Sequence, residues 1–318
     1  SKQQTIAAAV AKFRQSGKRV IAMADNYDQA QYYFASSADE IYMHDFGLVL
    51  IEGFGYFNAY FAEAINKLKV DVNVFRVGQY KSFVEPFLRN DMSAEDKLAA
   101  KRWLDGLWQI FRDDIIAARS LEPAAFDAYV SDPGSALRAA EGNAAKAAVD
   151  AGLIDGLKSH QEFRDYMIDI VGVSDDKPDS FANIDHLAYV TAMRNASLIS
   201  EPKPEVAVIV ASGDIVDGEA EAGTIGSATL TELIRQAAND ENIAAIVLRV
   251  DSGGGSMFAS EVIADQLEVV RQQGKPIVAS MSTLAASGGY YISLPADEIW
   301  AAESTISGSI GVGAVMPT

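Results

Sequence analysis

The sequence predicts an α/β protein built from two tandem, duplicated domains. Short continuous apolar runs that follow helical patterns, at residues 20–24 and 277–280, are typical of buried parallel strands. The chain also repeats itself, because SGKRVIAMADNYDQAQYYFASSADEIY at 16–42 is similar to QGKPIVASMSTLAASGGYYISLPADEIW at 273–300. Its 318 residues exceed the usual size of one domain. A duplicated α/β domain accounts for all three observations.

Each copy is expected to alternate helices and strands. The first copy begins in a helical pattern and continues with strands expected at 20–24, 41–44 and 70–77. Ser93-Ala-Glu-Asp96 then resembles a capping box, which predicts the start of a long amphipathic helix. In the second copy we expect a helix at 229–238 and strands at 206–211, 245–250, 277–280 and 299–302.

The two domains are expected to meet near residue 203. Residues 121–170 alternate helical patterns with Pro and Gly breaks, and Glu201-Pro-Lys-Pro204 precedes a fresh β-α-β unit. We therefore expect an N-terminal domain over 1–203, including an intervening helical segment, and a C-terminal domain over 204–318. Both chain ends look like the ends of a fragment, so each copy is expected to be truncated and an anchor could be missing.

Charge and composition exclude several classes of function. Acidic residues outnumber basic ones by 44 to 26, giving a net charge of −18, which argues against nucleic acid as a partner. The absence of cysteine rules out thiol catalysis, thiolate zinc sites and disulfides. The sequence contains no run of about 18 apolar residues, so we expect no transmembrane helix in it. The chain also does not begin with a recognisable signal peptide.

Ser287 is the candidate nucleophile, because it follows a buried strand and precedes two glycines at the start of a helix. A serine at this place could instead be a simple N-cap. As a nucleophile, its oxyanion would lie beside free backbone N–H groups. Aligning the Tyr-Tyr pairs of the two copies puts Gln29 opposite Ser287, so only the second copy carries the serine.

A serine nucleophile needs a base, and lysine is the better candidate. The histidines His44, His160 and His186 all lie outside the glycine-rich part of the second copy. Lys81 lies in the otherwise uncharged window VGQYKSF at the end of a strand, although an isolated lysine is usually a solvated surface charge. Burial would lower its pKa toward neutrality.

Two glycine-rich segments could bind an anion. DSGGGS at 251–256 lacks the Lys-Ser/Thr ending of a phosphate-binding loop, and GSIGVG at 308–313 has its glycines in the wrong order for a dinucleotide motif. Nucleotide cofactors are therefore not expected, and an oxyanion loop opposite Ser287 is the better use of the first segment.

Four motifs in this order, RVGQYKSFVEPF, RVDSGGGS, STLAASGGYY and STISGSIGV, closely resemble the signal peptide peptidase A family in its long, duplicated bacterial form. The resemblance covers essentially the whole chain and implies tandem Clp protease/crotonase-like domains. It also implies a Ser-Lys dyad of Ser287 and Lys81, with Ser309 orienting the lysine and the N–H groups of Gly255 and Gly288 holding the oxyanion. Where the family often has Pro, this chain has Gly253, which keeps the N–H donors.

The resemblance further implies a serine endopeptidase without a cofactor that degrades cleaved signal peptides and other apolar peptides. It implies a homo-oligomer, expected to be a tetramer, at the bacterial inner membrane with its catalytic part facing the periplasm. Two alternatives stay open: an enzyme that binds acyl-CoA on the same scaffold, and an inactive crotonase-like scaffold or binding module.

Overall fold

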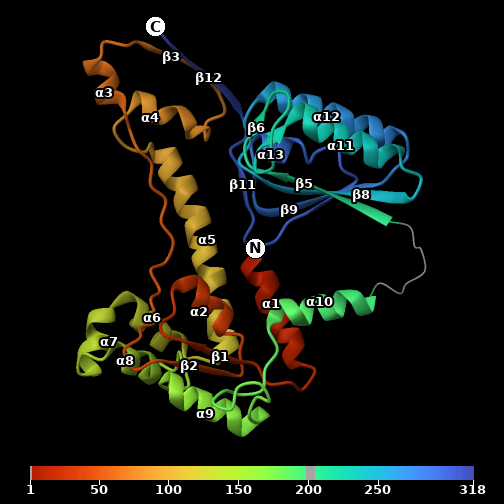
Figure 1. Ribbon diagram of the computed structural model, residues 1–318. Helices are drawn as coiled ribbons and strands as arrows, with labels where there is room; N and C mark the ends of the chain where they lie inside the picture. Colours follow the sequence, from red (N-terminus) through yellow and green to blue (C-terminus); the bar gives the residue numbers. More distant parts are fainter. Residues whose placement is uncertain (1, 198–204) are drawn as a thin grey trace. The chain divides into compact units, whose positions relative to one another are not determined.

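The computed structural model describes residues 2–197 and 205–318, which form two compact units (Figure 1). Unit 1 contains Phe54–Ile110 and Lys203–Thr318, and unit 2 contains Gln3–Gly53 and Phe111–Pro202. The expected domain border near residue 203 lies outside the described residues. The grouping of Phe54–Ile110 with the C-terminal part of the chain is a feature that a linear division of the sequence did not anticipate.

Unit 1 is built on a parallel sheet, which confirms the predicted α/β class. Its strands run in the order β10-β9-β8-β5, and β11 also pairs with β9. Because β9 is ten residues long, one part of it pairs with β10 and a later part with β11. The strands are β5 (Glu205–Ser212), β8 (Ile243–Ser252), β9 (Ile277–Ala286), β10 (Glu298–Trp300) and β11 (Ile306–Gly308).

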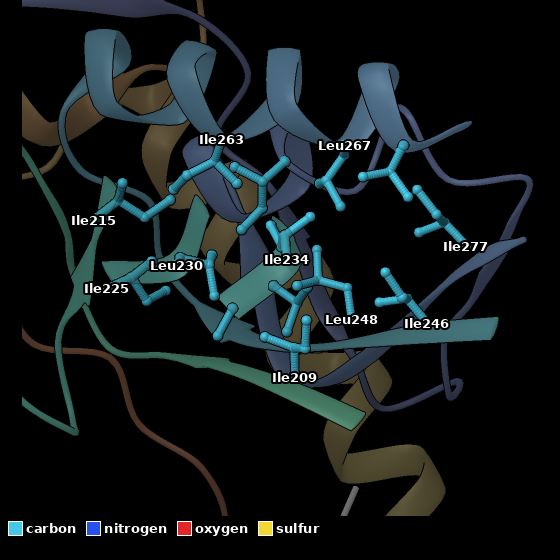
Figure 2. Packing of buried hydrophobic residues seen from close by; sticks show 14 of the residues in the cluster. Ile209, Ile215, Ile225, Leu230, Ile234, Ile246, Leu248, Ile263, Leu267 and Ile277 are labelled. Carbon is cyan, nitrogen blue, oxygen red and sulfur yellow. The ribbon is translucent and has the colours of Figure 1, made fainter. Parts of the chain in front are cut away.

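Two helices, α11 (Ser227–Asn239) and α12 (Met257–Gln272), bury the apolar core of unit 1 (Figure 2). Buried and exposed side chains alternate along β5, and Ile209 is one of the buried ones. It belongs to the same apolar cluster as Leu248 of β8. Ile234 and Ile263 of the helices are fully buried. Each such side chain contributes about 1.5–3 kcal/mol. The core thereby fixes the carboxyl ends of β8 and β9, from which the two glycine-containing loops emerge.

Unit 1 also has an antiparallel ribbon, in which β3 (Val72–Val77) pairs with β12 (Val312–Pro317). The shorter elements of this unit are α3 (Ala62–Lys67), the 3₁₀ turn η1 (Ser82–Val84), α4 (Glu85–Leu88), β6 (Ile215–Val216), β7 (Ile225–Gly226) and α13 (Gly288–Tyr291). The ribbon joins chain segments that lie far apart in the sequence.

The long helix α5 (Ala94–Arg119) begins where the sequence predicted, but the capping box is only half formed. The Asp96 N–H donates to Ser93 Oγ at 3.0 Å, as expected for an N-cap. The Ser93 N–H, however, donates to a carboxylate oxygen of Glu85 at 2.8 Å instead of to Asp96. The buried carboxylate of Glu85, on the preceding helix α4, thus accepts the hydrogen bond that Asp96 would accept in a complete capping box.

Unit 2 holds a small parallel sheet of β1 (Ile21–Ala24), β2 (Glu40–Met43) and β4 (Gly156–Leu157), in the order β1-β2-β4. Its helices, besides the end of α5, are α1 (Lys2–Arg14), α2 (Gln29–Ala35), α6 (Pro123–Ser131), α7 (Pro133–Ala139), α8 (Ala144–Asp150), α9 (His160–Val171) and α10 (His186–Ser197). No helix within residues 2–197 and 205–318 is both long enough and apolar enough to cross a membrane.

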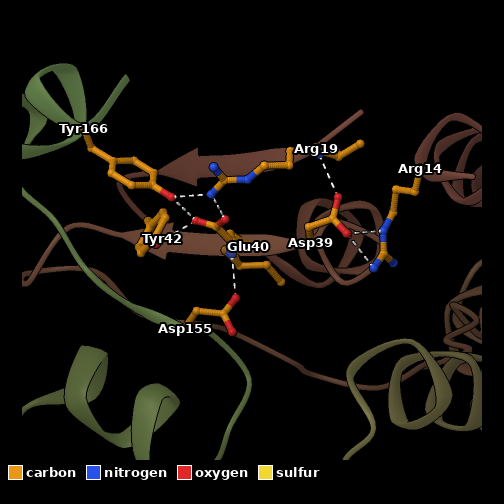
Figure 3. A network of polar contacts seen from close by, with 9 residues as sticks. Arg14, Arg19, Asp39, Glu40, Tyr42, Asp155 and Tyr166 are labelled. Atoms are coloured by element: carbon orange, nitrogen blue, oxygen red, sulfur yellow. Dashed lines mark hydrogen bonds and ion pairs between the residues drawn. The ribbon is translucent and has the colours of Figure 1, made fainter. Parts of the chain in front are cut away.

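A polar network holds the small sheet of unit 2 to α9 (Figure 3). Glu40 on β2 accepts hydrogen bonds from Arg19, from the Tyr42 hydroxyl at 2.8 Å and from the hydroxyl of Tyr166 on α9. One residue further along β2, the Ile41 N–H donates to the Asp155 carboxylate at 2.7 Å. The carboxylates therefore tie both a helix and a following loop to one strand.

The sequence repeat is also a structural repeat. In unit 2, the Asp39 carboxylate accepts from the Val20 N–H at 2.8 Å, just before β1 and β2. In unit 1, Asp297 accepts from the Ile277 N–H at the same distance, at the start of β9. Both strand pairs, β1–β2 and β9–β10, are parallel and have the same register relative to these carboxylates. The two copies thus preserve one local geometry in two separate units.

Candidate active site

Ser287 lies at a strained turn between β9 and α13. Its backbone has φ 51° and ψ −119°, a region that costs a residue with a side chain about 1–3 kcal/mol. The Ser287 N–H donates to the Gly308 carbonyl at 2.9 Å, which holds the turn against β11. The side chain makes no capping hydrogen bond. Ser287 therefore occupies the N-cap position of α13 without capping the helix through its side chain.

Lys81 reaches the same turn through the antiparallel ribbon. Val77 at the end of β3 is paired with Val312 at the start of β12. Gly78 follows with φ 113°, and its carbonyl accepts from the Lys81 N–H at 3.2 Å, so the chain turns directly after the ribbon. Since Ser309 lies just before β12, the pairing brings Lys81 and Ser309 together from distant parts of the sequence.

The Lys81 ammonium nitrogen contacts both serines. Nζ lies 2.6 Å from Ser287 Oγ, 2.8 Å from the Ser309 carbonyl oxygen and 3.2 Å from Ser309 Oγ. All of these atoms belong to unit 1. Three oxygen neighbours fix the position of Nζ against the serine hydroxyl, which is the reach that a general base requires.

Burial lowers the pKa of Lys81 below its ordinary value, because few water molecules remain to stabilise the charged form. The residue is only 7 % exposed. Within the described part of the chain, no carboxylate forms an ion pair with its ammonium group. Burial thus makes the neutral amine, the form that can accept a proton, easier to reach than in a solvent-exposed lysine.

The glycine loop after β8 lies against the Ser287 turn. A Cβ atom built on Gly254 would lie 2.5 Å from the Gly288 nitrogen and 3.0 Å from Ser287 Oγ, so only glycine fits there. Gly255 is bridged to Ile215 of β6. Among the described residues, no hydrogen bond occupies the N–H of Gly255 or of Gly288. These amides are consequently free to bind an oxygen atom near the serine.

A cavity of about 880 Å³ opens at the two serines and the lysine. Its walls are formed mainly by glycines and by apolar side chains, including Phe83, Met257, Leu294 and Ile310. Several of these apolar side chains are about half exposed, as in a site prepared to bury a ligand. Asp214 also lines the cavity.

The structure brings all five residues named from the sequence to one place. Lys81, Ser287, Gly255, Gly288 and Ser309 all line the cavity. Sequence reasoning placed Gly254 in the expected oxyanion loop, but its close approach to Ser287 follows from the loop path and not from its residue type. Sequence reasoning missed the carboxylate and the apolar walls of the cavity, because short loops carry no periodicity that reveals which side chains converge.

The three histidines belong to unit 2 and have partners there. His160 contacts Asp25, and His44 contacts its neighbour Asp45. The hydroxyl of Ser287, in unit 1, is instead bonded to Lys81. A lysine partner therefore agrees with the expectation from the sequence.

In the first copy, Gln29 fills the position of the serine with a structural side chain. Its Oε1 accepts from the N–H groups of Glu52 and Gly53 at 3.1 and 2.8 Å, and its Nε2 donates to the Gly53 carbonyl at 3.1 Å. The bridge between Tyr27 and Val49 repeats the pairing of β9 with β11. The first copy has thus kept the local backbone while its central side chain holds a loop.

Known proteins similar to this chain are peptidases. A protein named Protease 4 from Haemophilus influenzae is 39% identical over 98% of this chain, and one from Salmonella typhi is 40% identical over 98%. The chloroplastic serine protease SPPA of Arabidopsis thaliana is 25% identical over 95% of this chain. The chain spans about half the length of these relatives, since it covers 51%, 50% and 44% of them.

The model of one family, described as Peptidase family S49, matches residues 12–174 and 269–318. The two matched segments include both copies of the sequence repeat, and the second includes Ser287 and Ser309. Together they cover more than half of the sequence, and the chain therefore belongs to peptidase family S49.

Proposed function

We propose that this chain carries the active site of a serine endopeptidase that uses a Ser-Lys dyad. The observation that supports it best is the 2.6 Å contact between Lys81 Nζ and Ser287 Oγ, formed where burial favours a neutral lysine. A serine hydroxyl is a weak nucleophile until a base removes its proton. In this proposal Lys81 is that base, and its contact with the strained turn that carries Ser287 supports the assignment.

In the first half of the reaction, Lys81 takes the proton of Ser287 while Oγ forms a bond to the peptide carbonyl carbon. The carbonyl oxygen becomes an oxyanion, which the N–H groups of Gly255 and Gly288 stabilise. The carbon–nitrogen bond then breaks, and the protonated Lys81 gives its proton to the leaving amine. An acyl-enzyme on Ser287 remains.

In the second half, Lys81 takes a proton from water as the water oxygen attacks the ester carbon. Collapse of this intermediate breaks the bond to Oγ, and the proton returns from Lys81 to Ser287. Ser309 keeps Nζ in place through both halves with its carbonyl and hydroxyl oxygens. The cycle restores the starting state without a cofactor.

The proposed substrates are cleaved signal peptides and other apolar peptides. The half-exposed apolar walls of the cavity fit extended chains of this kind. We further propose that the complete protein assembles as a homo-oligomer, a tetramer, at the bacterial inner membrane with this site facing the periplasm. The statements on assembly and location rest on the resemblance of the sequence motifs alone.

Cleavage of a fluorogenic apolar peptide tests the dyad. We expect Ser287→Ala and Lys81→Ala each to lower kcat/KM by at least about 10³-fold, because the two residues act as one unit. Ser307→Ala on β11 and Lys67→Ala on α3 are matched controls in the same unit, since both positions are exposed. Circular dichroism shows whether each variant is folded.

A serine-directed acylating or phosphonylating reagent gives a second readout. The expected adduct lies on Ser287 and is absent from Ser287→Ala, as mass spectrometry of the digested protein would show. Full peptidase activity in a folded Ser287→Ala or Lys81→Ala variant would overturn the dyad. A thioester of coenzyme A processed at the same rate by wild type and Lys81→Ala would instead favour the acyl-CoA alternative.

A further inference from the structure

The charge of the active-site cavity comes from few residues. Among the described residues that line it, Lys81 and Asp214 are the only acidic or basic side chains. Lys81 is buried and is neutral when it acts as the base. The working cavity therefore carries one negative charge, which belongs to Asp214.

The Asp214 carboxylate is available to a ligand. The residue is exposed, and no hydrogen bond or ion pair from the described part of the chain reaches its side chain. Among the described residues, the hydrogen bond made by Asp214 is one of its backbone: its carbonyl accepts from the Ile225 N–H at 2.9 Å. A carboxylate with four unused lone-pair directions is a good partner for an ammonium or guanidinium group.

The backbone at Asp214 is held firmly beside the proposed oxyanion loop. The next residue, Ile215, is 1% exposed and donates its N–H to the Gly254 carbonyl at 2.9 Å. The Ile215 carbonyl accepts from the Ser256 N–H at 2.8 Å. Because the peptide carbonyl under attack is expected to bind at this loop, the carboxylate lies within a few residues of the scissile bond along a bound peptide.

We propose that Asp214 is a specificity-determining residue, which selects peptides with a lysine or arginine side chain near the cleaved bond. The apolar walls accept the neighbouring side chains, and the carboxylate adds a preference for positive charge among apolar sequences. This inference rests on the proposed peptidase function. It adds to that function one charged subsite that recognises one class of side chain.

A peptide series tests the subsite. A fluorogenic apolar peptide is prepared with lysine, norleucine or glutamate at each position from four residues before the cleaved bond to two after it. At one position or two adjacent positions, we expect wild type to cleave the lysine peptide about 2- to 5-fold faster in kcat/KM than the norleucine peptide, the range typical of an exposed ion pair. The glutamate peptide should be slowest, and added salt should reduce the differences.

Variants assign the preference to the carboxylate. In Asp214→Asn the ratio of lysine to norleucine should fall to about 1, and in Asp214→Lys the glutamate peptide should become the better substrate. Glu241→Gln is the matched control, because it removes one exposed carboxylate of the same unit outside the cavity. The control should keep the wild-type ratio.

Equal rates for lysine and norleucine at every position, or an unchanged ratio in Asp214→Asn, would overturn the inference while leaving the dyad intact. Binding of the same labelled peptides to Ser287→Ala, measured by fluorescence anisotropy, separates the two proposals. If wild type cleaves no peptide, the dyad fails. A lysine preference in binding that Asp214→Asn in the Ser287→Ala background removes would then still support the subsite, and its absence would refute it.

Discussion

Replacing Gly254 with alanine should strongly lower peptidase activity without replacing any group that takes part in the proposed reaction. The new Cβ would lie 2.5 Å from the Gly288 nitrogen and 2.8 Å from Ser287 Cβ, whereas ordinary van der Waals contact begins near 3.4 Å. The loop and the serine turn must therefore separate by about 0.9 Å. Since a misplacement of about 1 Å costs on the order of 10²-fold in rate, we expect kcat/KM to fall by at least about 10²-fold.

The matched control is Gly274→Ala, in the turn before β9. Gly274 also has a positive φ, 84°, but nothing lies within 4 Å of a Cβ built on it. Both variants carry backbone strain of about 1 kcal/mol, and Gly254→Ala carries the cost of the clash in addition. Steady-state cleavage of a fluorogenic peptide, beside thermal melts, separates strain from geometry. Wild-type kcat/KM in Gly254→Ala, or an equal loss in Gly274→Ala, would refute the reasoning.

Three further predictions follow from single contacts. For Lys81, kcat/KM should rise with pH through an ionisation below lysine's ordinary value, because burial lowers its pKa. Above that lowered pKa, Lys81 binds more protons in the unfolded chain than in the folded one. The free energy of unfolding should therefore also rise with pH, up to about 10.5, and Lys81→Met should remove this rise. Ser309→Ala should lower kcat/KM by about 3- to 10-fold, since it removes the hydroxyl contact to Nζ while the carbonyl contact remains; an unchanged rate in Ser309→Ala would contradict an orienting role. Gln29→Ala should lower unfolding stability by about 1–3 kcal/mol in urea titrations, because two N–H groups lose their acceptor; an unshifted midpoint would show that the amide holds nothing.

The strands and helices of the second copy could be predicted well from the sequence. Its apolar runs are short and continuous, and the structure confirms each as a parallel strand, although β9 extends further than predicted, to Ala286, and β10 is exposed. The expected strand at 70–77 is also present, as β3, but its partner could not be foreseen. Val77 and Val312 are paired because of the path of the whole chain, which no local pattern of residue types records.

The site could be predicted in its parts but not in its geometry. Ser287 and Lys81 each stand out locally, yet the residue types alone could not decide between a cap and a nucleophile, or between a surface lysine and a base. The structure distinguishes these alternatives by the burial of Lys81 and by the positive φ of Ser287. Both features arise from tertiary contacts, which the sequence pattern does not record. Asp214 escaped notice because an exposed aspartate in a loop is ordinary unless the cavity beside it is known.

The ribbon of β3 and β12 also determines when the contact between Lys81 and Ser287 can form during synthesis. Lys81 and Ser287 are separated by 206 positions, and closing a loop of that length costs on the order of 5 kcal/mol of chain entropy. Chains emerge from the ribosome with the N-terminus first. Lys81 therefore has no contact with Ser287 until Val312–Pro317 has been made and β12 can pair with β3. A nascent chain that stops before β12 lacks the ribbon, and with it the contact between the two side chains.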